Sequence, residues 1–330
     1  MKGLSLFSNV GIGETYLEQI GIEIIVANEL LEDRAEFYKK VYPKTQMICG
    51  DITDPEIYSQ IIESSRGVDL LMATPPCQGM SAANAMKKPN DPRNSLIKKV
   101  VAAINDLDPT YILIENVRAM QKTFINHNGS AIGILEFIKQ NISPDYEMHC
   151  KVLNSSDLGT PQHTKRLITL ISKGGVWKHP ESLGTTTTVR QAIGHLPSLE
   201  SEEKTDIPWH FGRKHNSNHI LWMKNTPTGK TAFDNRIHYP KTRDKDTGMM
   251  RRIKGFRTTY KRIEWDEPSP TIGMTNGAIN SQNNVHPGSL LEDGTYSDAR
   301  VLSVKEIVVL CGLPETHYDK YEGETAENFL

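Results

Sequence analysis

The chain has 330 residues, 37% of them hydrophobic, with 38 Lys and Arg against 40 Asp and Glu. At roughly 150 residues per domain, this length predicts about two domains. No apolar run is longer than five residues, no secretory signal is recognisable, and the four cysteines have no C-x-x-C spacing. These features exclude a transmembrane helix, a disulfide framework and a zinc site, so we expect a reduced, cytoplasmic protein without a membrane partner.

The first 175 residues alternate short apolar runs, typical of buried strands, with stretches that predict helices. The expected strands are residues 4–7, 23–27, 68–73, 111–115, 147–153 and 167–172. The expected helices are residues 15–19, 30–41, 55–64, 95–106 and 130–140. This alternation predicts a doubly wound α/β domain with a parallel sheet, whose ligands bind beyond the carboxyl ends of the strands.

A glycine-containing loop follows the first expected strand, Phe7-Ser8-Asn9-Val10-Gly11-Ile12-Gly13. Glycines let the backbone turn tightly and approach a ligand. Tyr16 occupies the third glycine position of a pyrophosphate-binding fingerprint, which favours a smaller adenosine cofactor, with a purely structural turn as the alternative. Glu29 and Asp51 follow the next two strands, where they are placed to accept hydrogen bonds from a ribose and an amino group. Either carboxylate alone is also explained as a helix N-cap.

Three reactive side chains are expected at the same edge of the sheet. Cys77 follows two prolines at the end of the fourth strand, which exposes its sulfur, although a lone cysteine is more often structural. Glu115 ends the next strand against apolar walls, which favours a raised pKa and a role as a proton donor. Arg166 begins a further strand and adds a cation. Together these groups form a set that can attack an electron-poor heterocycle.

Residues 210–262 are strongly basic, although the whole chain has a net charge of −2. This segment contains fourteen Lys and Arg and three Asp, so its net charge is +11. The other 277 residues therefore carry a net charge of −13. Interleaved aromatic rings can stack on bases while the cations neutralise phosphates, and a solvated basic insertion is the alternative. The histidines of this segment are expected to be polar surface residues in loops rather than metal ligands: His210, His215, His219 and His238.

Several motifs occur in a fixed order along the chain: Pro75-Pro76-Cys77-Gln78 with Ser81, Asp91-Pro92-Arg93, Glu115-Asn116-Val117, Gln162 with Arg166, Trp265-Asp266-Glu267-Pro268-Ser269-Pro270-Thr271-Ile272, and Arg300-Val301-Leu302-Ser303-Val304-Lys305-Glu306. In this order and spacing the chain resembles the cytosine-C5 DNA methyltransferases over essentially its whole length. The resemblance implies a Rossmann-like, S-adenosylmethionine-dependent methyltransferase sheet with a smaller, loop-rich target-recognition domain. We expect a catalytic and cofactor-binding domain at 1–177, a basic target-recognition domain at 178–285, and a return segment at 286–330 that packs on the catalytic domain.

The resemblance also implies methyl transfer from S-adenosylmethionine to carbon 5 of a cytosine flipped out of double-stranded DNA. Cys77 would add to carbon 6, Glu115 would donate to ring nitrogen 3, and Arg166 would hold the O2 carbonyl. The cofactor contacts carry over to Phe7, Gly11, Gly13, Glu29, Asp51, Ile52, Pro76 and Leu96. The DNA contacts carry over to Gln78, Ser81, Arg93 and Thr271. Residues 79–94 are expected to form a mobile loop that closes over DNA, and no metal is implied.

Two departures from the family pattern affect these expectations. Thr164 stands where the family has the first of two arginines, and the chain ends without the family's Gly-Asn-Ala-Val-Pro-like last motif. The second departure predicts either a truncated chain or a split enzyme completed by a second polypeptide. Three functions stay open: a bacterial or phage DNA cytosine-C5 methyltransferase of the restriction-modification type, a cytosine-C5 RNA methyltransferase, and a DNA-binding subunit inactive until a second polypeptide completes it.

Overall fold

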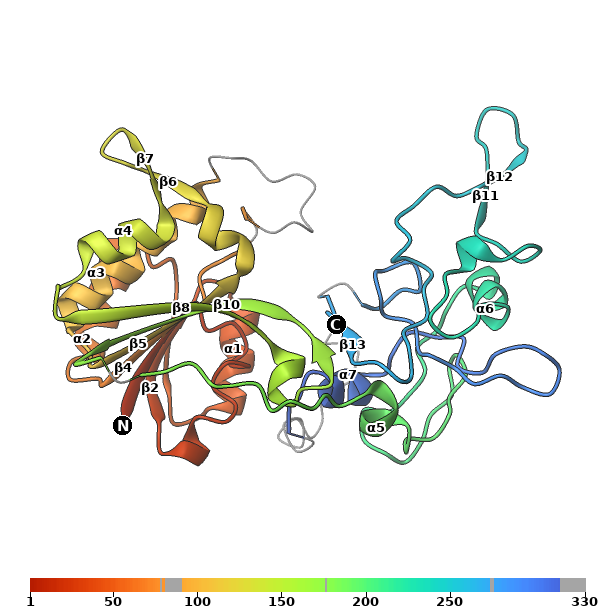
Figure 1. The fold of residues 1–330 in the computed structure, drawn as a ribbon, viewed down its shortest axis with the longest axis horizontal. Helices are drawn as coiled ribbons and strands as arrows, with labels where there is room; N and C mark the ends of the chain where they lie inside the picture. Colours follow the sequence, from red (N-terminus) through yellow and green to blue (C-terminus); the bar gives the residue numbers. More distant parts are fainter. Residues whose placement is uncertain (78, 81–90, 176, 274–275, 315–330) are drawn as a thin grey trace. The chain divides into compact units, whose positions relative to one another are not determined.

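The computed structural model describes residues 1–77, 79–80, 91–175, 177–273 and 276–314. Within these residues the chain folds as two compact units, which Figure 1 shows coloured along the sequence. Unit 1 comprises Met1–Asn154 and Lys165–Glu181. Unit 2 comprises Ser155–Thr164 and the described residues from Ser182 onward.

Unit 1 is built on a seven-stranded sheet with the strand order β3-β2-β1-β4-β5-β10-β8. Its strands are β1 (Lys2–Leu6), β2 (Glu23–Glu29), β3 (Gln46–Cys49), β4 (Leu70–Ala73), β5 (Tyr111–Val117), β8 (Tyr146–Asn154) and β10 (Lys165–Lys173). β1 to β5 pair in parallel, whereas β10 is antiparallel to both of its neighbours. The prediction of a wholly parallel sheet is therefore wrong at β10. No α-helix connects β8 to β10, and a parallel pair would need a crossover connection.

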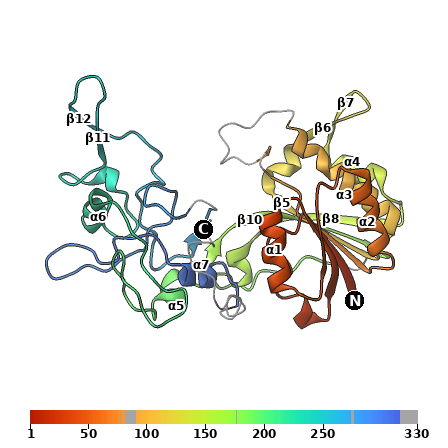
Figure 2. The same cartoon turned by 180° about the vertical axis from the view of Figure 1, so that it is seen from behind.

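Helices cover both faces of this sheet. They are α1 (Glu32–Val41), α2 (Pro55–Ser64), α3 (Ile97–Leu107) and α4 (Ile134–Asn141), with the short 3-10 helices η1 (Glu18–Ile20), η2 (Pro92–Leu96) and η3 (Arg118–Lys122). α2, α3 and α4 pack into the main apolar core, whereas α1 packs through Tyr38 into a separate cluster with Ile24 and Ala27. The strands lie between α1 and the other three helices in both views (Figures 1 and 2).

Local sequence signals explain where these elements agree with the predicted ranges and where they differ. α2 has the predicted range, because Asp54 caps its first turn by accepting two backbone hydrogen bonds. The helix expected at 15–19 is wrong, since only the 3-10 turn η1 forms there. Residues 130–133 form the strand β7 (Ser130–Gly133), which pairs with β6 (Phe124–His127), so α4 begins late. Asn128 and Gly129 have positive φ angles of 52° and 82°, the conformation that tight hairpin turns require.

Unit 2 is rich in loops, as the sequence predicted. Its elements are η4 (Ser155–Leu158), β9 (Gln162–His163), α5 (Val189–Ile193), α6 (Ser217–Lys224), η5 (Ala232–Asp234), β11 (Lys241–Arg243), β12 (Met250–Arg252), β13 (Ser269–Pro270) and α7 (Val304–Leu310). Its interior holds an ionic cluster in which the buried Arg300 donates to both carboxylate oxygens of Glu306, at 2.8 and 2.9 Å, and to Asp298 at 2.8 Å. Neither unit contains, among its described residues, a helix with the length and apolar content that crossing a membrane would require.

Candidate active site

The carboxyl ends of β1 and β4 lie at one level of the sheet, and β5 continues three residues further. In the strand register Leu6 pairs with Ala73, and Ala73 pairs with Ile114, whereas β5 ends at Val117. The loops after β1 and β4 and the last residues of β5, which include Glu115, therefore lie at the edge where parallel α/β sheets bind their ligands.

Two side-chain hydrogen bonds hold the loop that carries Cys77. Thr74 Oγ1 donates to the carbonyl oxygen of Phe7 at 2.9 Å, and Asn116 Nδ2 donates to the carbonyl oxygen of Pro75 at 2.8 Å. Asn116 is buried, so this bond fixes the loop against the end of β5. Cys77 is partly exposed, in keeping with the position that the two prolines predicted.

Glu115 and Arg166 form an ion pair at the same edge, with 2.9 Å between Oε1 and Nε. Ile168, which shares a strand face with Arg166, is the partner of Glu115 in the register, so the two side chains meet on one face. Burial raises the pKa of Glu115, while the charge and the hydrogen bond of Arg166 oppose the rise. The net shift is upward, which is the direction that a proton donor requires.

Asp91 fixes the guanidinium of Arg93 in one orientation. Arg93 donates to the two carboxylate oxygens of Asp91 at 2.8 and 2.6 Å, and its backbone N–H donates to the same side chain. The pKa of Arg93 is raised, first by the hydrogen bond to Asp91 and further by electrostatic interaction with Asp91 and with Cys77. A cation therefore lies within electrostatic range of the sulfur. The other two DNA contacts predicted near Cys77, Gln78 and Ser81, lie outside the described residues, as does most of the expected mobile loop.

The loop after β1 has a strained and closely packed backbone. Phe7 and Asn9 have positive φ angles of 59° and 53°, which are uncommon for residues with a side chain and cluster at functional sites. Gly11 has a φ of 80°, and an added Cβ would collide with the ring of Tyr42, whose hydroxyl donates to the Gly11 carbonyl at 2.6 Å. At Gly13 an added Cβ would meet a neighbour only at 3.3 Å, so glycine is less strictly required there.

The two predicted cofactor carboxylates have different surroundings. Glu29 is buried, and it accepts from the backbone N–H groups of Asn9 at 2.9 Å and Leu31 at 3.0 Å. It therefore shapes the loop after β1, and each of its oxygens retains a lone pair that can accept from a ribose hydroxyl. Asp51 is exposed and accepts from Thr53 through one oxygen only. Because Asp54 caps α2, the N-cap alternative is wrong for Asp51.

The remaining predicted cofactor positions are apolar and follow the same edge. Ile52 is buried, whereas Pro76 and Leu96 are half-buried. A closely packed glycine turn, two carboxylates with spare acceptor sites and apolar side chains fit the polar and apolar parts of an adenosine cofactor.

Sequence reasoning missed Glu14, a buried carboxyl group next to Gly13. Glu14 Oε1 accepts a hydrogen bond from Ser5 Oγ at 2.5 Å, and burial raises its pKa to about 7. The one available signal was the polar Ser5 between Leu4 and Leu6 of β1. Glu14 thus places a titratable group beneath the glycine loop.

In unit 2, Thr271 follows β13 and is exposed. Its Oγ1 donates to the carbonyl oxygen of His163 at 2.8 Å and accepts from Thr164 Oγ1 at 3.2 Å. Thr164 also hydrogen-bonds to the side chain of Gln162. Thr164, which stands where the family has the first of two arginines, therefore forms a short polar bridge between β9 and Thr271, the residue after β13.

Several members of the basic segment 210–262 are buried, which corrects the expectation that they face DNA. Arg262 is fully buried and donates to the backbone carbonyls of Met223, His286, Ser297 and Asp298. Burial lowers its pKa only to about 10, so it remains a cation that joins the end of α6 to the loops at His286 and at Ser297 and Asp298. Trp222 and Tyr260 pack in an apolar cluster, and His210 is 1% exposed and bonded to Ser303, so the surface interpretation is wrong for His210. Within the described residues, no three His, Cys, Asp or Glu side chains are grouped to hold a metal.

Comparison with known proteins identifies the family. The model of the C-5 cytosine-specific DNA methylases matches residues 1–329. The chain belongs to this family. The methylase is 47% identical over 322 residues to the Type II methyltransferase M1.HgaI of Avibacterium volantium, a match that covers 96% of this chain and 88% of the relative. It is 27% identical over 319 residues to the Type II methyltransferase M1.HphI of Haemophilus parahaemolyticus, covering 94% and 77% of the two chains.

Solved structures share the fold of the methylase at low sequence identity. A structure assigned as a DNA modification methyltransferase encoded within an Escherichia coli prophage aligns with a TM-score of 0.65 at 18% identity, covering 96% of this chain and 90% of the other. The Entamoeba histolytica methyltransferase EhMeth aligns with a TM-score of 0.56 at 14% identity, covering 99% and 91%. The predicted methyltransferase fold is thereby confirmed.

Proposed function

We propose that the methylase transfers a methyl group from S-adenosylmethionine to carbon 5 of a flipped cytosine in DNA, with Cys77, Glu115 and Arg166 as catalytic residues. Membership of the C-5 cytosine-specific DNA methylases supports the reaction. The observation that supports the residue roles is the Glu115–Arg166 pair beside a cysteine loop that Asn116 ties to the same strand.

Cys77 supplies the nucleophile. Its sulfur forms a bond to carbon 6 of cytosine, and the ring electrons displaced toward carbon 5 make that carbon nucleophilic. Glu115 donates a proton to nitrogen 3, which neutralises the charge that develops on the ring, and Arg166 donates to O2. Bound S-adenosylmethionine supplies the methyl group. A solvent water then takes the proton from carbon 5, and the electrons of that bond re-form the carbon 5–carbon 6 double bond as the sulfur–carbon bond breaks and the thiolate leaves. Nitrogen 3 returns its proton to the Glu115 carboxylate, which restores the donor.

The cofactor is held by the loops that follow the first strands. The backbone of Phe7, Gly11 and Gly13 gives it a close-packed turn, and Glu29 accepts from its ribose. Asp51 accepts from the adenine amino group through its unbonded oxygen. Ile52, Pro76 and Leu96 supply apolar contacts.

Recognition of double-stranded DNA is assigned to residues 178–285, after the catalytic domain at 1–177 and before the return segment at 286–330. Arg93 and Thr271, with Gln78 and Ser81, contact the DNA. Relatives from bacteria with Type II methyltransferase names support a cytoplasmic role in a restriction-modification system. Methylation of RNA is not favoured, because the family model that matches the chain describes DNA methylases.

Bisulfite sequencing of plasmid DNA from cells that express the chain tests the function. We expect 5-methylcytosine within one sequence motif, its loss in Cys77→Ser, and a strong decrease in Glu115→Gln. Unmethylated plasmid from the wild type would oppose activity of the chain alone.

Co-expression of the neighbouring gene product, with a pull-down, then tests completion by a second polypeptide. Titration with S-adenosylmethionine distinguishes an inactive DNA-binding subunit, which would bind no cofactor.

A further inference from the structure

Strands β11 and β12 form a short antiparallel hairpin in unit 2, and the proposed reaction does not use it. β11 and β12 are exposed at every residue, and the hairpin stands out from the rest of its unit (Figure 1). Residues 241–252 contain five cations and two acids. An exposed strand pair of this kind packs no core, so its side chains are free to contact a partner.

The register of the hairpin places cations on both of its faces. Lys241 pairs with Arg252, Thr242 with Arg251, and Arg243 with Met250. Because directly paired residues share a face and successive residues alternate, Lys241, Arg243 and Arg252 lie on one face and Arg251 on the other. A ribbon with cations on both faces suits a groove whose two walls are phosphate backbones.

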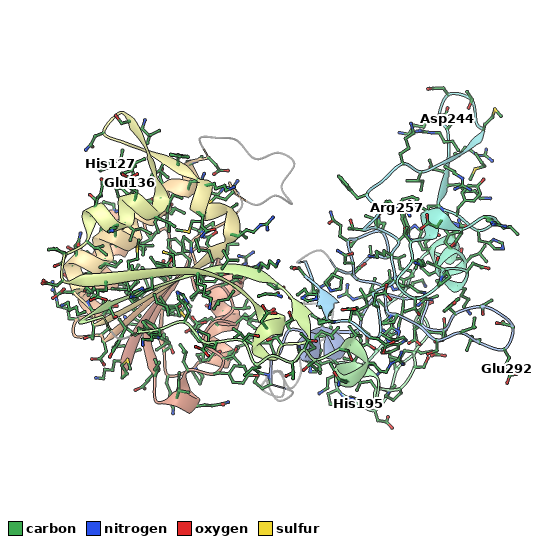
Figure 3. The ribbon with its side chains drawn as sticks, viewed as in Figure 1. His127, Glu136, His195, Asp244, Arg257 and Glu292 are labelled. Carbon is green, nitrogen blue, oxygen red and sulfur yellow. The ribbon has the colours of Figure 1, made fainter. Side chains whose placement is uncertain are left out.

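Asp244 fixes the tip of the hairpin, where Figure 3 labels it. Its carboxylate accepts from the backbone N–H groups of Asp246 and Thr247 at 3.1 and 3.0 Å, and it forms an ion pair with Arg251 at 3.1 Å. At the base, the guanidinium of Arg252 lies 3.7 Å from the centroid of the Tyr239 ring. Isolated two-stranded hairpins are marginal in water, so these contacts preorganise the ribbon and lower the entropic cost of binding.

Arg243 is the arginine of this ribbon left for recognition. Its side chain is exposed, and its guanidinium has no hydrogen bond or ion pair to any described residue, whereas Arg251 and Arg252 are engaged. The major groove of DNA admits a two-stranded ribbon, and the fork of an arginine matches O6 and N7 of guanine. We propose that the β11–β12 hairpin enters the major groove of the duplex and that Arg243 reads a guanine of the recognition sequence, while Lys241 and Lys245 contact phosphates. This inference rests on the proposed function, since it assumes a duplex DNA substrate.

The test uses the full chain and compares charge with geometry at one position. Arg243→Lys keeps the charge but loses the fork, Arg243→Ala loses both, and Lys241→Ala with Lys245→Ala removes two phosphate contacts. Arg66→Ala, an exposed arginine of unit 1, is the matched control. Bisulfite sequencing of a methylated random-sequence plasmid library gives the base preference. Fluorescence anisotropy measures how the affinity for DNA depends on salt concentration. Its probe is a labelled 30-bp duplex, about three helical turns long, that carries the motif methylated by the wild type.

Both Arg243 variants are expected to lose discrimination at one guanine position by about tenfold to a hundredfold. Arg243→Lys should keep most of the affinity. The double lysine variant should keep the base preference. It should lower the salt slope, the steepness with which the logarithm of the affinity falls with the logarithm of the salt concentration, by about two. The inference is overturned if the wild type methylates one motif and both Arg243 variants methylate it with unchanged preference, or if Arg66→Ala has the same effect. A wild type that binds the duplex and methylates nothing opposes the proposed function instead, and the salt slopes then still decide whether the hairpin contacts DNA.

Discussion

At the scale of a single residue, two opposing effects act on the pKa of Glu115. Burial raises its pKa, and Arg166 opposes the rise from 2.9 Å. The sequence predicted the raised pKa because apolar residues surround the end of the strand. It also predicted Arg166 at this edge, but not the direct ion pair with Glu115, since that contact depends on the antiparallel register of β10 with β5.

Replacing Arg166 with Gln should shift the pH dependence of methylation. Removal of the cation raises the pKa of Glu115 further, so the proton donor stays protonated to higher pH. The decrease in kcat at alkaline pH should therefore move to higher pH, while kcat itself falls because a contact to cytosine is lost. Steady-state rates between pH 6 and 10 measure this, with the exposed neighbour Lys165→Gln as control. An unmoved alkaline limb would contradict the pairing.

Glu14 should make the free energy of unfolding depend on pH. Its pKa is about 7 in the folded chain, against 4.5 for an ordinary glutamate. The stabilisation is fully present below pH 4.5 and is lost as the pH rises through 7, a decrease of about 3 kcal/mol. Glu14→Gln, which can still accept from Ser5, should abolish this decrease and be the more stable form at pH 8. Urea unfolding at pH 5 and pH 8 measures it, with the exposed Glu18→Gln as control. Equal pH dependence in both variants would exclude Glu14 as the source.

At the scale of elements, the loop after β1 shows which constraints a sequence can reveal. The glycines predicted a tight turn, but the reason for Gly11 is the ring of Tyr42, which comes from the end of α1. The predicted range of α2 is correct, and the structure shows that its first turn is fixed locally, by the cap at Asp54. The helix expected at 15–19 was wrong, because in this segment the packing of the buried Glu14 and its glycine loop outweighs local helix propensity.

Two glycines with the same backbone conformation allow a matched test of this loop. Gly11 and Gly21 have φ angles of 80° and 78°, but an added Cβ collides with Tyr42 only at Gly11 and meets nothing within 4 Å at Gly21. Both alanine variants should lose about 1 kcal/mol of stability from the positive φ. Only Gly11→Ala should also weaken S-adenosylmethionine binding, by about tenfold or more, because the loop must move to make room for the added Cβ beside Tyr42. Isothermal titration of the two variants decides, and equal cofactor affinities would contradict the assigned role of the loop.

At the scale of the whole molecule, the near-neutral charge conceals two chemically different units. The basic segment was visible in the sequence, whereas the burial of Arg262 and the ionic cluster of Arg300 were not. Loops cannot satisfy their carbonyls by regular pairing, so unit 2 uses buried guanidinium groups instead. Burial alone would raise the pKa of Glu306, but the charges of His286 and Arg300 outweigh it and lower this pKa to about 2.

Breaking this cluster should unfold unit 2 in preference to unit 1. Glu306→Gln leaves Arg300 with one fewer carboxylate in a buried site, which costs about 3–5 kcal/mol. Hydrogen exchange should show lost protection in residues 182–314 and unchanged protection in residues 1–154. Asp266→Asn, which removes the exposed ion pair with Arg190, is the control and should leave the protection of both units essentially unchanged, because solvent screens an exposed pair. Equal loss of protection in both units would show that they do not unfold separately.

The central claim is that Cys77 forms a covalent bond to carbon 6 of the target cytosine. Fluorine at carbon 5 cannot leave as a proton does, so an oligonucleotide with 5-fluorocytosine in the recognised motif should trap the adduct. With S-adenosylmethionine, the wild type is expected to give one denaturation-resistant protein–DNA complex, whose mass-mapped attachment point is Cys77, and Cys77→Ala should give none. An adduct that survives in Cys77→Ala, or a wild type that methylates cytosine yet forms no adduct, would contradict the account.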